Sequence, residues 1–353
     1  MIAIQPTQAE TSQTPPPVPV GVDTGAGSLK LAIAGTRVRT PSKVVEVNDL
    51  EDDLKSSEGG YFFYQDGERT DLISKQFLTG SLASWKAPTT HTKLSDDSVL
   101  KVEYSLHTLL GGLATLPYAR EWNLHLVLSI HNSKLFKDAL ASKINGSHIV
   151  SFGSKNSSAS LVNLNVSLVV PEGAGSYSYC VAAKPEPLID RTAQAIAIDF
   201  GTSTVIPTVF APGGAIIHRQ VLEVGGCIDL LEAIAADPEL IQFLGTGKAG
   251  SVETIRLGVE SGDFQYGTRS YNFRHIYARH LTPWLKDRLR LAFKEIAEWR
   301  DVAQSFVAWG GGVQMPGVSK MLQSLCITPV PDACWANALG LERMAAGRLA
   351  RGK

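Results

Sequence analysis

Two short stretches of the chain have the residue types needed to hold a phosphate group and a metal ion. Residues 20–34, VGVDTGAGSLKLAIA, and residues 195–210, AIAIDFGTSTVIPTVF, share one pattern. An apolar run ends on an aspartate and continues through a Gly/Ser/Thr turn into a second apolar run, which predicts a β-hairpin with small residues at its tip. Glycines in such a turn let backbone N–H groups approach phosphate oxygens, and hydroxyl groups add donors.

The charged residues of these hairpins predict how a nucleotide would be held. Asp23 and Asp199 end the two first strands, where a carboxylate can hold hydrated Mg²⁺, a cation that prefers oxygen ligands and keeps several waters. Lys30, near the first tip, can direct a flexible cation toward the phosphates. Because the two aspartates lie half a chain apart, we expect a duplicated domain that closes on one nucleotide.

A third glycine-rich segment follows a predicted strand at residues 305–309. It consists of Gly310, Gly311 and Gly312, and side chains at these positions would block a flat ligand. Two other patterns are less informative. The GTGK stretch at residues 245–248 lacks the spacing and the preceding strand of a P-loop. His275 and His280 are five residues apart, which is not the same-face spacing of a helical metal site.

Composition excludes several classes of function. With 353 residues, 44% hydrophobic and 19% charged, the chain is long enough for two ordinary domains. A formal charge of −1 argues against direct binding to nucleic acid, so that any DNA contact would pass through a partner. The four cysteines lack C-x-x-C spacing and no apolar run reaches the length of a membrane span, which predicts a cytoplasmic protein without membrane contact. Residues 1–19, rich in Pro, Thr and Gln, predict a disordered tail.

Periodicity and turn residues predict the other elements. We expect strands at 122–130, 161–170, 177–182, 216–224 and 327–330, and helices at 99–116, 133–144, 229–236, 273–299, 316–325 and 333–346. The strand at 122–130 opens into the helix that follows, a place where α/β folds put reacting groups. His131 and Asn132 lie at this junction and are candidates for catalysis, although His131 could instead only complete a loop.

The three glycine-rich segments, in this order, resemble the phosphate 1, phosphate 2 and adenosine motifs of the actin, Hsp70 and sugar-kinase superfamily. The resemblance covers residues 20–346. Within that superfamily, SLVVPEGAGSYSY at 167–179 and LGVESGDFQYG at 257–267 are similar to segments of bacterial plasmid-segregation actins of the ParM type. The resemblance implies an α/β, actin-like fold of two duplicated ribonuclease-H-like domains, each with a mixed five-stranded sheet, and Mg-ATP in the cleft between them.

The resemblance also implies domain boundaries and residue roles. Domain I would span 20–188 with a smaller inserted subdomain at about 40–100, domain II would span 189–330, and residues 331–353 would return to domain I as a helix. Asp23 and Asp199 would hold Mg²⁺ through water. The nucleotide would lie among Gly25, Gly27, Ser28, Lys30, Gly201, Thr202, Ser203 and Thr204 at the phosphates, Gly225 and Gly226 near the ribose, and Gly310, Gly311 and Gly312 at the adenosine.

One departure from the ParM pattern concerns hydrolysis. ParM-type proteins place a glutamate just after the strand that corresponds to residues 124–130, where it orients the attacking water. Here that position reads His131, Asn132, Ser133, without an acid. An asparagine can orient a water but is a poor base, so we expect slow hydrolysis, with Asn132, His131 and Asp199 as the catalytic set.

The leading hypothesis is therefore an ATPase that self-associates into filaments. The filaments would segregate DNA through a DNA-binding adaptor protein or serve as a cytoskeletal element. A small-molecule kinase of the same fold and a filament scaffold that does not hydrolyse nucleotide are the alternatives.

Overall fold

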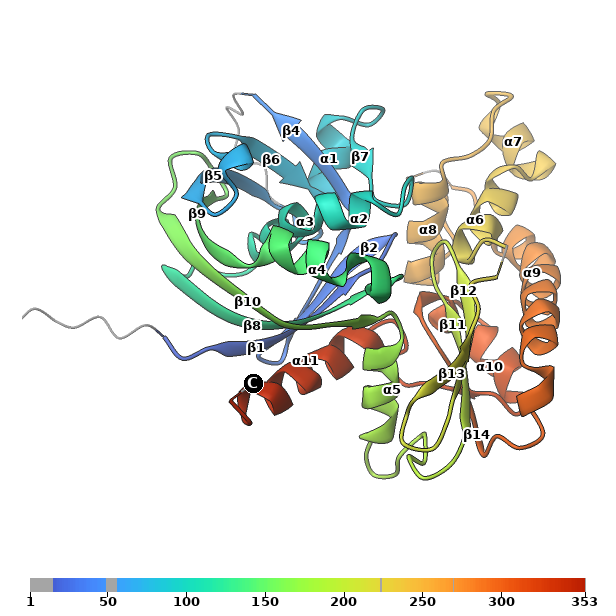
Figure 1. Ribbon diagram of the computed structural model, residues 1–353. Coiled ribbons are helices and arrows are strands. Elements are labelled where there is room, and N and C mark those ends of the chain that lie inside the picture. Colours follow the sequence, from blue (N-terminus) through green and yellow to red (C-terminus); the bar gives the residue numbers. More distant parts are fainter. Residues whose placement is uncertain (1–14, 49–55, 223, 269, 353) are drawn as a thin grey trace, which may run out of the picture.

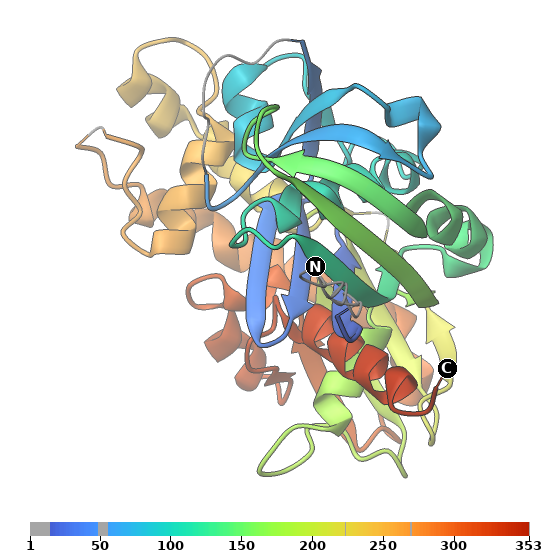
Figure 2. The same ribbon diagram turned by 90° about the vertical axis from the view of Figure 1, so that its left-hand side faces the viewer.

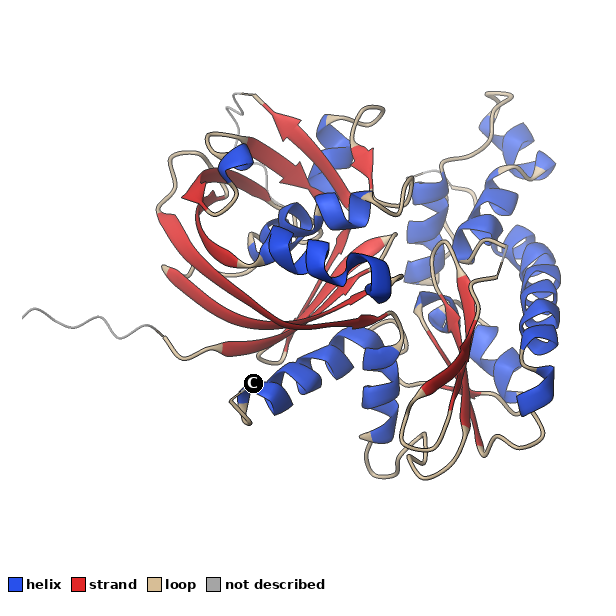
Figure 3. Cartoon of the chain, in the orientation of Figure 1, coloured by secondary structure: helices blue, strands red, loops and turns tan. Residues whose placement is uncertain are grey.

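The two predicted hairpins belong to two separate sheets (Figures 1 and 3). The structure is a computed structural model that describes residues 15–48, 56–222, 224–268 and 270–352. In it, β1 (Val18–Thr24) pairs antiparallel with β2 (Ser28–Ile33), and β11 (Ala195–Phe200) pairs in the same way with β12 (Val205–Phe210). Both predicted hairpins are confirmed.

The sheet of the first domain is larger than the expected five strands. Its order is β3-β2-β1-β8-β10-β9-β5-β6-β4-β7 in the described part of the chain. The sheet continues because β9 pairs with β10 on one side and with β5, a strand of the smaller subdomain, on the other. The bounds are β3 (Thr36–Pro41), β4 (Lys43–Val47), β5 (Tyr61–Gly67), β6 (Gln76–Thr79), β7 (Thr92–Lys93), β8 (Glu121–Ile130), β9 (Gly146–Phe152) and β10 (Ala159–Pro171).

Among the described residues, the sheet of the second domain has five strands, as expected, in the order β13-β12-β11-β14-β15. Helices of residues 227–323 cover it and form the right-hand side of Figure 1. The bounds are β13 (Ile216–Arg219), β14 (Ser305–Trp309), β15 (Thr328–Pro329), α6 (Cys227–Ala235), α7 (Pro238–Leu244), α8 (Val252–Ser261), α9 (Arg274–Glu295), η2 (Ala297–Trp299), η3 (Gly311–Gln314) and α10 (Val318–Gln323).

Helices cover both faces of the central strands of the first domain. Leu126 of β8 packs in a core with Leu109 of α3, whereas its neighbour Val127 packs on the opposite face with Leu341 of α11. Because both faces are buried, β8 can be apolar along most of its length. Figure 2 shows α11 lying against these strands. The remaining helices are η1 (Thr70–Leu72), α1 (Gly80–Lys86), α2 (Leu100–Glu103), α3 (Ser105–Leu113), α4 (Ser133–Ile144) and α11 (Ala336–Leu349).

Four sequence-based expectations about these elements are wrong. Residues 177–182, expected as a strand, belong to the helix α5 (Ala174–Val181), which begins after Gly173 at a φ of 90°. The helix expected at 99–116 divides at Tyr104 into α2 and α3. The strand expected at 216–224 ends at Arg219, where its pairing with β12 ends. Val18 and Pro19, assigned to a tail, pair with β8 within β1; residues 1–14 of that tail lie outside the described residues.

Helix α5 makes contacts with the core of the second domain. Cys180 of α5 is buried in the second core, and Tyr177 stacks on Phe210 of β12 with ring centroids 4.5 Å apart. α5 therefore packs on the second sheet, although its residues precede the expected start of the second domain at 189.

The two domains are joined where α5 crosses α11. A Cβ atom on Gly340 of α11 would overlap the carbonyl oxygen of Gly175 in α5, and a Cβ on Gly175 would overlap the backbone of Asn337. Only glycine lets the two helix backbones approach so closely. Because α5 packs on the second sheet and α11 on the first, this crossing fixes how the two domains meet.

We predict that Gly340→Ala destabilises the protein by about 2 kcal/mol or more, because the added methyl group overpacks the helix crossing. Gly347→Ala in the same helix is the matched control, since the nearest atom to a Cβ there is a flexible Arg351 guanidinium nitrogen at 3.8 Å. That change should leave stability equal or slightly higher. Urea unfolding followed by circular dichroism measures both, and equal effects would contradict the assignment of Gly340 to a close crossing.

Candidate functional site: a cavity between the two domains

A cavity of about 680 Å³ lies between the two domains and has the size of a small-molecule site. Both hairpin turns and the strand end of β14 line it. Thirteen of the predicted site residues are in its wall: Asp23, Gly25, Gly27, Ser28, Lys30, His131, Asp199, Gly201, Thr202, Ser203, Thr204, Gly310 and Gly311.

The two turns touch each other across the cavity. A Cβ on Gly27 would lie 2.5 Å from the hydroxyl oxygen of Thr202, so the first turn has no room for a side chain here. Ser42 holds the first turn, because its N–H donates to the carbonyl of Gly27 at 3.2 Å. The first N–H of α6, on Cys227, holds the second turn by donating to the carbonyl of Gly201 at 3.0 Å.

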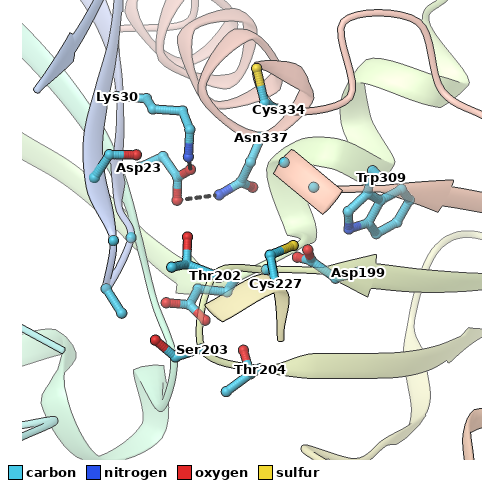
Figure 4. A pocket seen from close by; sticks show the side chains of 18 of the residues that line it. Asp23, Lys30, Asp199, Thr202, Ser203, Thr204, Cys227, Trp309, Cys334 and Asn337 are labelled. Carbon is cyan, nitrogen blue, oxygen red and sulfur yellow. Dashed lines mark hydrogen bonds and ion pairs between the residues drawn. The ribbon is translucent and has the colours of Figure 1, made fainter. Parts of the chain in front are cut away.

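Asp23 is held on the side of the first domain by Lys30 and Asn337 (Figure 4). The ammonium of Lys30 lies 3.2 Å from Oδ2, and the amide of Asn337 in α11 donates to Oδ1 at 2.9 Å. The same amide donates to Ser129 at 2.8 Å, while the Oδ1 of Asn337 is buried without a partner among the described residues. Asn337 was not predicted from the sequence, because its contact depends on the return of α11 to the first sheet.

Asp199 lies on the opposite side, at the end of β11 (Figure 4). Gly310, at a φ of 90°, packs its backbone against this carboxylate. Burial, with the negative charges of Glu172 and Asp23 nearby, raises the pKa of Asp199 to about 7. A cation bound nearby would favour the ionised form of Asp199.

Asp23 and Asp199 leave space between them for a hydrated metal ion. No group of three or more His, Cys, Asp or Glu side chains in the described part of the chain is arranged to hold a metal. Asp23 and Asp199 lie on opposite walls of the cavity, which leaves room for the water shell that Mg²⁺ retains.

The cavity has an acid that sequence reasoning missed. Glu172 follows β10, the parallel neighbour of β8, and its N–H donates to the carbonyl of Ile130 at 3.1 Å. The segment after β8 itself has no acid, as its sequence shows, but the end of the neighbouring strand β10 supplies one. The sequence signal that could have located Glu172 is the turn of Pro171, Glu172 and Gly173 after a predicted strand. The ends of parallel strands meet at one edge of a sheet, so this turn lies beside the end of β8.

Four predicted site residues do not line the cavity. The side chain of Asn132 caps α4 by accepting from the N–H of Leu135 at 3.2 Å. The other three, Gly225, Gly226 and Gly312, lie behind the wall, where Gly226 packs against the backbone of the second turn and Gly312 against Cys227. His131 does line the cavity, and burial together with the charge of Lys101 lowers its pKa.

The rim of the cavity carries an ion pair between the domains. Arg39 of β3 contacts Glu260 of α8 at 2.9 Å, and Arg256 of the same helix also binds Glu260. All three residues line the cavity, and none was predicted from the sequence, because they meet only across the domain boundary.

The other patterns noted in the sequence lie elsewhere. The GTGK stretch is an exposed loop after α7. His275 pairs with Glu239 and His280 with Asp237. The four cysteines are unpaired, and none of the described helices is both long and apolar enough to cross a membrane.

Comparison with known proteins agrees with this architecture. Residues 21–175 match the N-terminal domain of actin-like proteins. The actin-like protein Alp7A aligns with a TM-score of 0.71 at 15% identity, covering 94% of this chain and 97% of that one. The chain has an actin-like fold, and its residues 21–175 match the N-terminal domain of that family. The resemblance and the fold class expected from its sequence are confirmed.

Other structures similar to this actin-like chain have informative descriptions. A 15-stranded ParM filament from Clostridium botulinum aligns with a TM-score of 0.69 at 15% identity, covering 94% of this chain and 99% of that one. An archaeal actin homologue in complex with ADP aligns with a TM-score of 0.68 at 17% identity, covering 93% and 99%. No curated protein matches the sequence.

The raised pKa of Asp199 predicts a pH dependence of stability in metal-free solution. Between an unfolded pKa of about 3.9 and the folded value of about 7, the folded state keeps a proton that the unfolded state loses. The free energy of unfolding therefore falls as pH rises through this range, by at most about 1.4 kcal/mol per pH unit. Asp199→Asn should be more stable than the natural chain at pH 8, with a smaller difference at pH 5. Urea unfolding of both proteins in EDTA, at a series of pH values, tests this. A difference in free energy of unfolding that is the same at pH 5 and pH 8 would contradict it.

Proposed function

We propose that the chain binds Mg-ATP in the cavity between its domains, polymerises into filaments in the cytoplasm and hydrolyses ATP slowly. One observation carries this proposal: the two Gly/Ser/Thr turns, each after a strand that ends on an aspartate, meet at Gly27 and Thr202 across the cavity. Turns of this kind offer backbone N–H groups and hydroxyls to phosphate oxygens from both domains at once.

The lining residues support distinct roles toward such a ligand. Lys30 offers a cation to the phosphates, and Asp23 and Asp199 are placed to accept hydrogen bonds from water around Mg²⁺. The open space beside Gly311, where a Cβ would meet no atom within 4 Å, suits a flat base. Bound Mg-ATP would supply a phosphorus atom open to attack by water; the protein positions that water.

Two residues are candidates to orient the water. Asn132 was expected from the sequence, but its side chain caps α4. Glu172 supports this role better, because it lines the cavity beside His131 and is a stronger acceptor.

The fold also supports self-association. Ligand contacts from both domains would favour the closed arrangement about the crossing of α5 and α11. A closed form that presents two complementary surfaces at opposite ends builds an open filament. A net charge of −1 favours DNA segregation through a DNA-binding adaptor over direct DNA contact, and a cytoskeletal role would need no adaptor.

We expect filaments with ATP and Mg²⁺, and none with ADP, in electron microscopy and pelleting of the purified chain. Asp199→Ala should abolish the filaments, because it removes one of the two carboxylates that face the metal. Filaments under all conditions would instead support a scaffold that does not depend on nucleotide. Absence of filaments, together with phosphate transfer to a small acceptor, would identify a kinase of the same fold.

Glu172→Gln should slow phosphate release from ATP by about 100-fold or more while ATP still binds, because the acceptor for the water is lost. Asn132→Ala is the matched comparison. It should change the hydrolysis rate less than about threefold and lower stability by about 1 kcal/mol, the usual loss of a helix cap. If Asn132→Ala slows hydrolysis more than Glu172→Gln does, Asn132 and not Glu172 orients the water.

A further inference from the structure

Lys101 is a buried lysine whose charge faces the cavity. It lies in α2, its side chain is 10% exposed, and its ammonium lies 2.9 Å from a carboxylate oxygen of Glu172, which is 15% exposed. Lysine is rarely buried unless it is paired. Lys101 and Glu172 both line the cavity, so this pair is part of its wall.

Four acidic and four basic side chains line the cavity, the pair among them. Asp23, Asp199 and Glu172 line the same cavity, and the negative charge of Glu172 contributes to the raised pKa of Asp199. Lys30 is engaged by Asp23. Lys101 is therefore a second lysine of the cavity wall, and it comes from α2 whereas Lys30 comes from β2. The partner of Lys101 is Glu172, the acid best placed to orient water.

A phosphate oxygen can compete with Glu172 for Lys101. The ammonium is a compact charge on a flexible four-carbon chain, so it can turn between two acceptors without movement of α2. A terminal phosphate carries more negative charge than one carboxylate. The diphosphate of ADP lacks that group, so it offers Lys101 a weaker alternative.

We propose that Lys101 is a positioning residue that distinguishes a nucleoside triphosphate from a diphosphate by exchanging Glu172 for the terminal phosphate. The exchange releases the carboxylate of Glu172 to accept a hydrogen bond from water. This inference rests on the proposed nucleotide binding and adds a residue that couples recognition of the third phosphate to the acid beside it.

The test is the affinity for ATP and for ADP, measured by calorimetry with Mg²⁺. Lys101→Met should weaken ATP binding by about 10- to 100-fold, the contribution of one charge-assisted hydrogen bond, and ADP binding by less than about threefold. Lys101→Arg should restore part of the preference for ATP. Lys143→Met is the control, because Lys143 also forms a lysine–carboxylate pair, with Glu103 at 2.8 Å, outside the cavity; its ATP-to-ADP ratio should stay unchanged.

Glu172→Gln should change the preference for ATP over ADP in the opposite direction to Lys101→Met. A purely structural role of the Lys101–Glu172 pair would not produce this result. Without the carboxylate, Lys101 has no partner to exchange, so this variant should bind ATP more tightly relative to ADP than the natural chain does. It also decides the question if Lys101→Met fails to fold. Equal weakening of both nucleotides by Lys101→Met, or an unchanged ratio in Glu172→Gln, would overturn the exchange. Absence of any nucleotide binding by the natural chain would instead refute the proposed function and this inference with it.

Discussion

Two carboxylates from different domains share one cavity, and their mutual repulsion constrains the structure around them. Asp23 is stabilised by Lys30 and by the amide of Asn337, whereas burial beside Asp23 and Glu172 raises the pKa of Asp199. The fold holds both groups at strand ends, where the paired backbone limits their movement. A metal ion that binds here gains electrostatic energy but must also shift Asp199 to its ionised form.

The sequence predicts correctly those elements that depend on interactions between residues close together in the chain. The two hairpins and the strand before Gly310 were predicted because small turn residues and apolar runs are read within a few positions. Residues 177–182 were misassigned because aromatic and β-branched residues there favour a strand. In the structure, the close contact of Gly175 with α11 and the stacking of Tyr177 on Phe210 stabilise a helix instead.

The site shows the same division. Its glycines and aspartates were predicted from their own segments, but Glu172 was missed because its place depends on which strand lies beside β8. Lys101 and Asn337 reach the cavity from helices that are distant in sequence, so no spacing could indicate them. Asn132 has the right position after its strand, but the N-terminus of α4 uses its side chain as a cap, a local role that competes with catalysis.

The continuous sheet of the first domain has a mechanical consequence. Because β9 pairs with both β10 and β5, hydrogen bonds connect the strand beside the cavity to the outermost strands of the inserted subdomain. A rotation of the two domains about the helix crossing would thus be transmitted as leverage to the far edge of that sheet, where a small angle becomes a large displacement. The inserted subdomain would then move together with the strands beside the cavity, because one hydrogen-bonded sheet contains both.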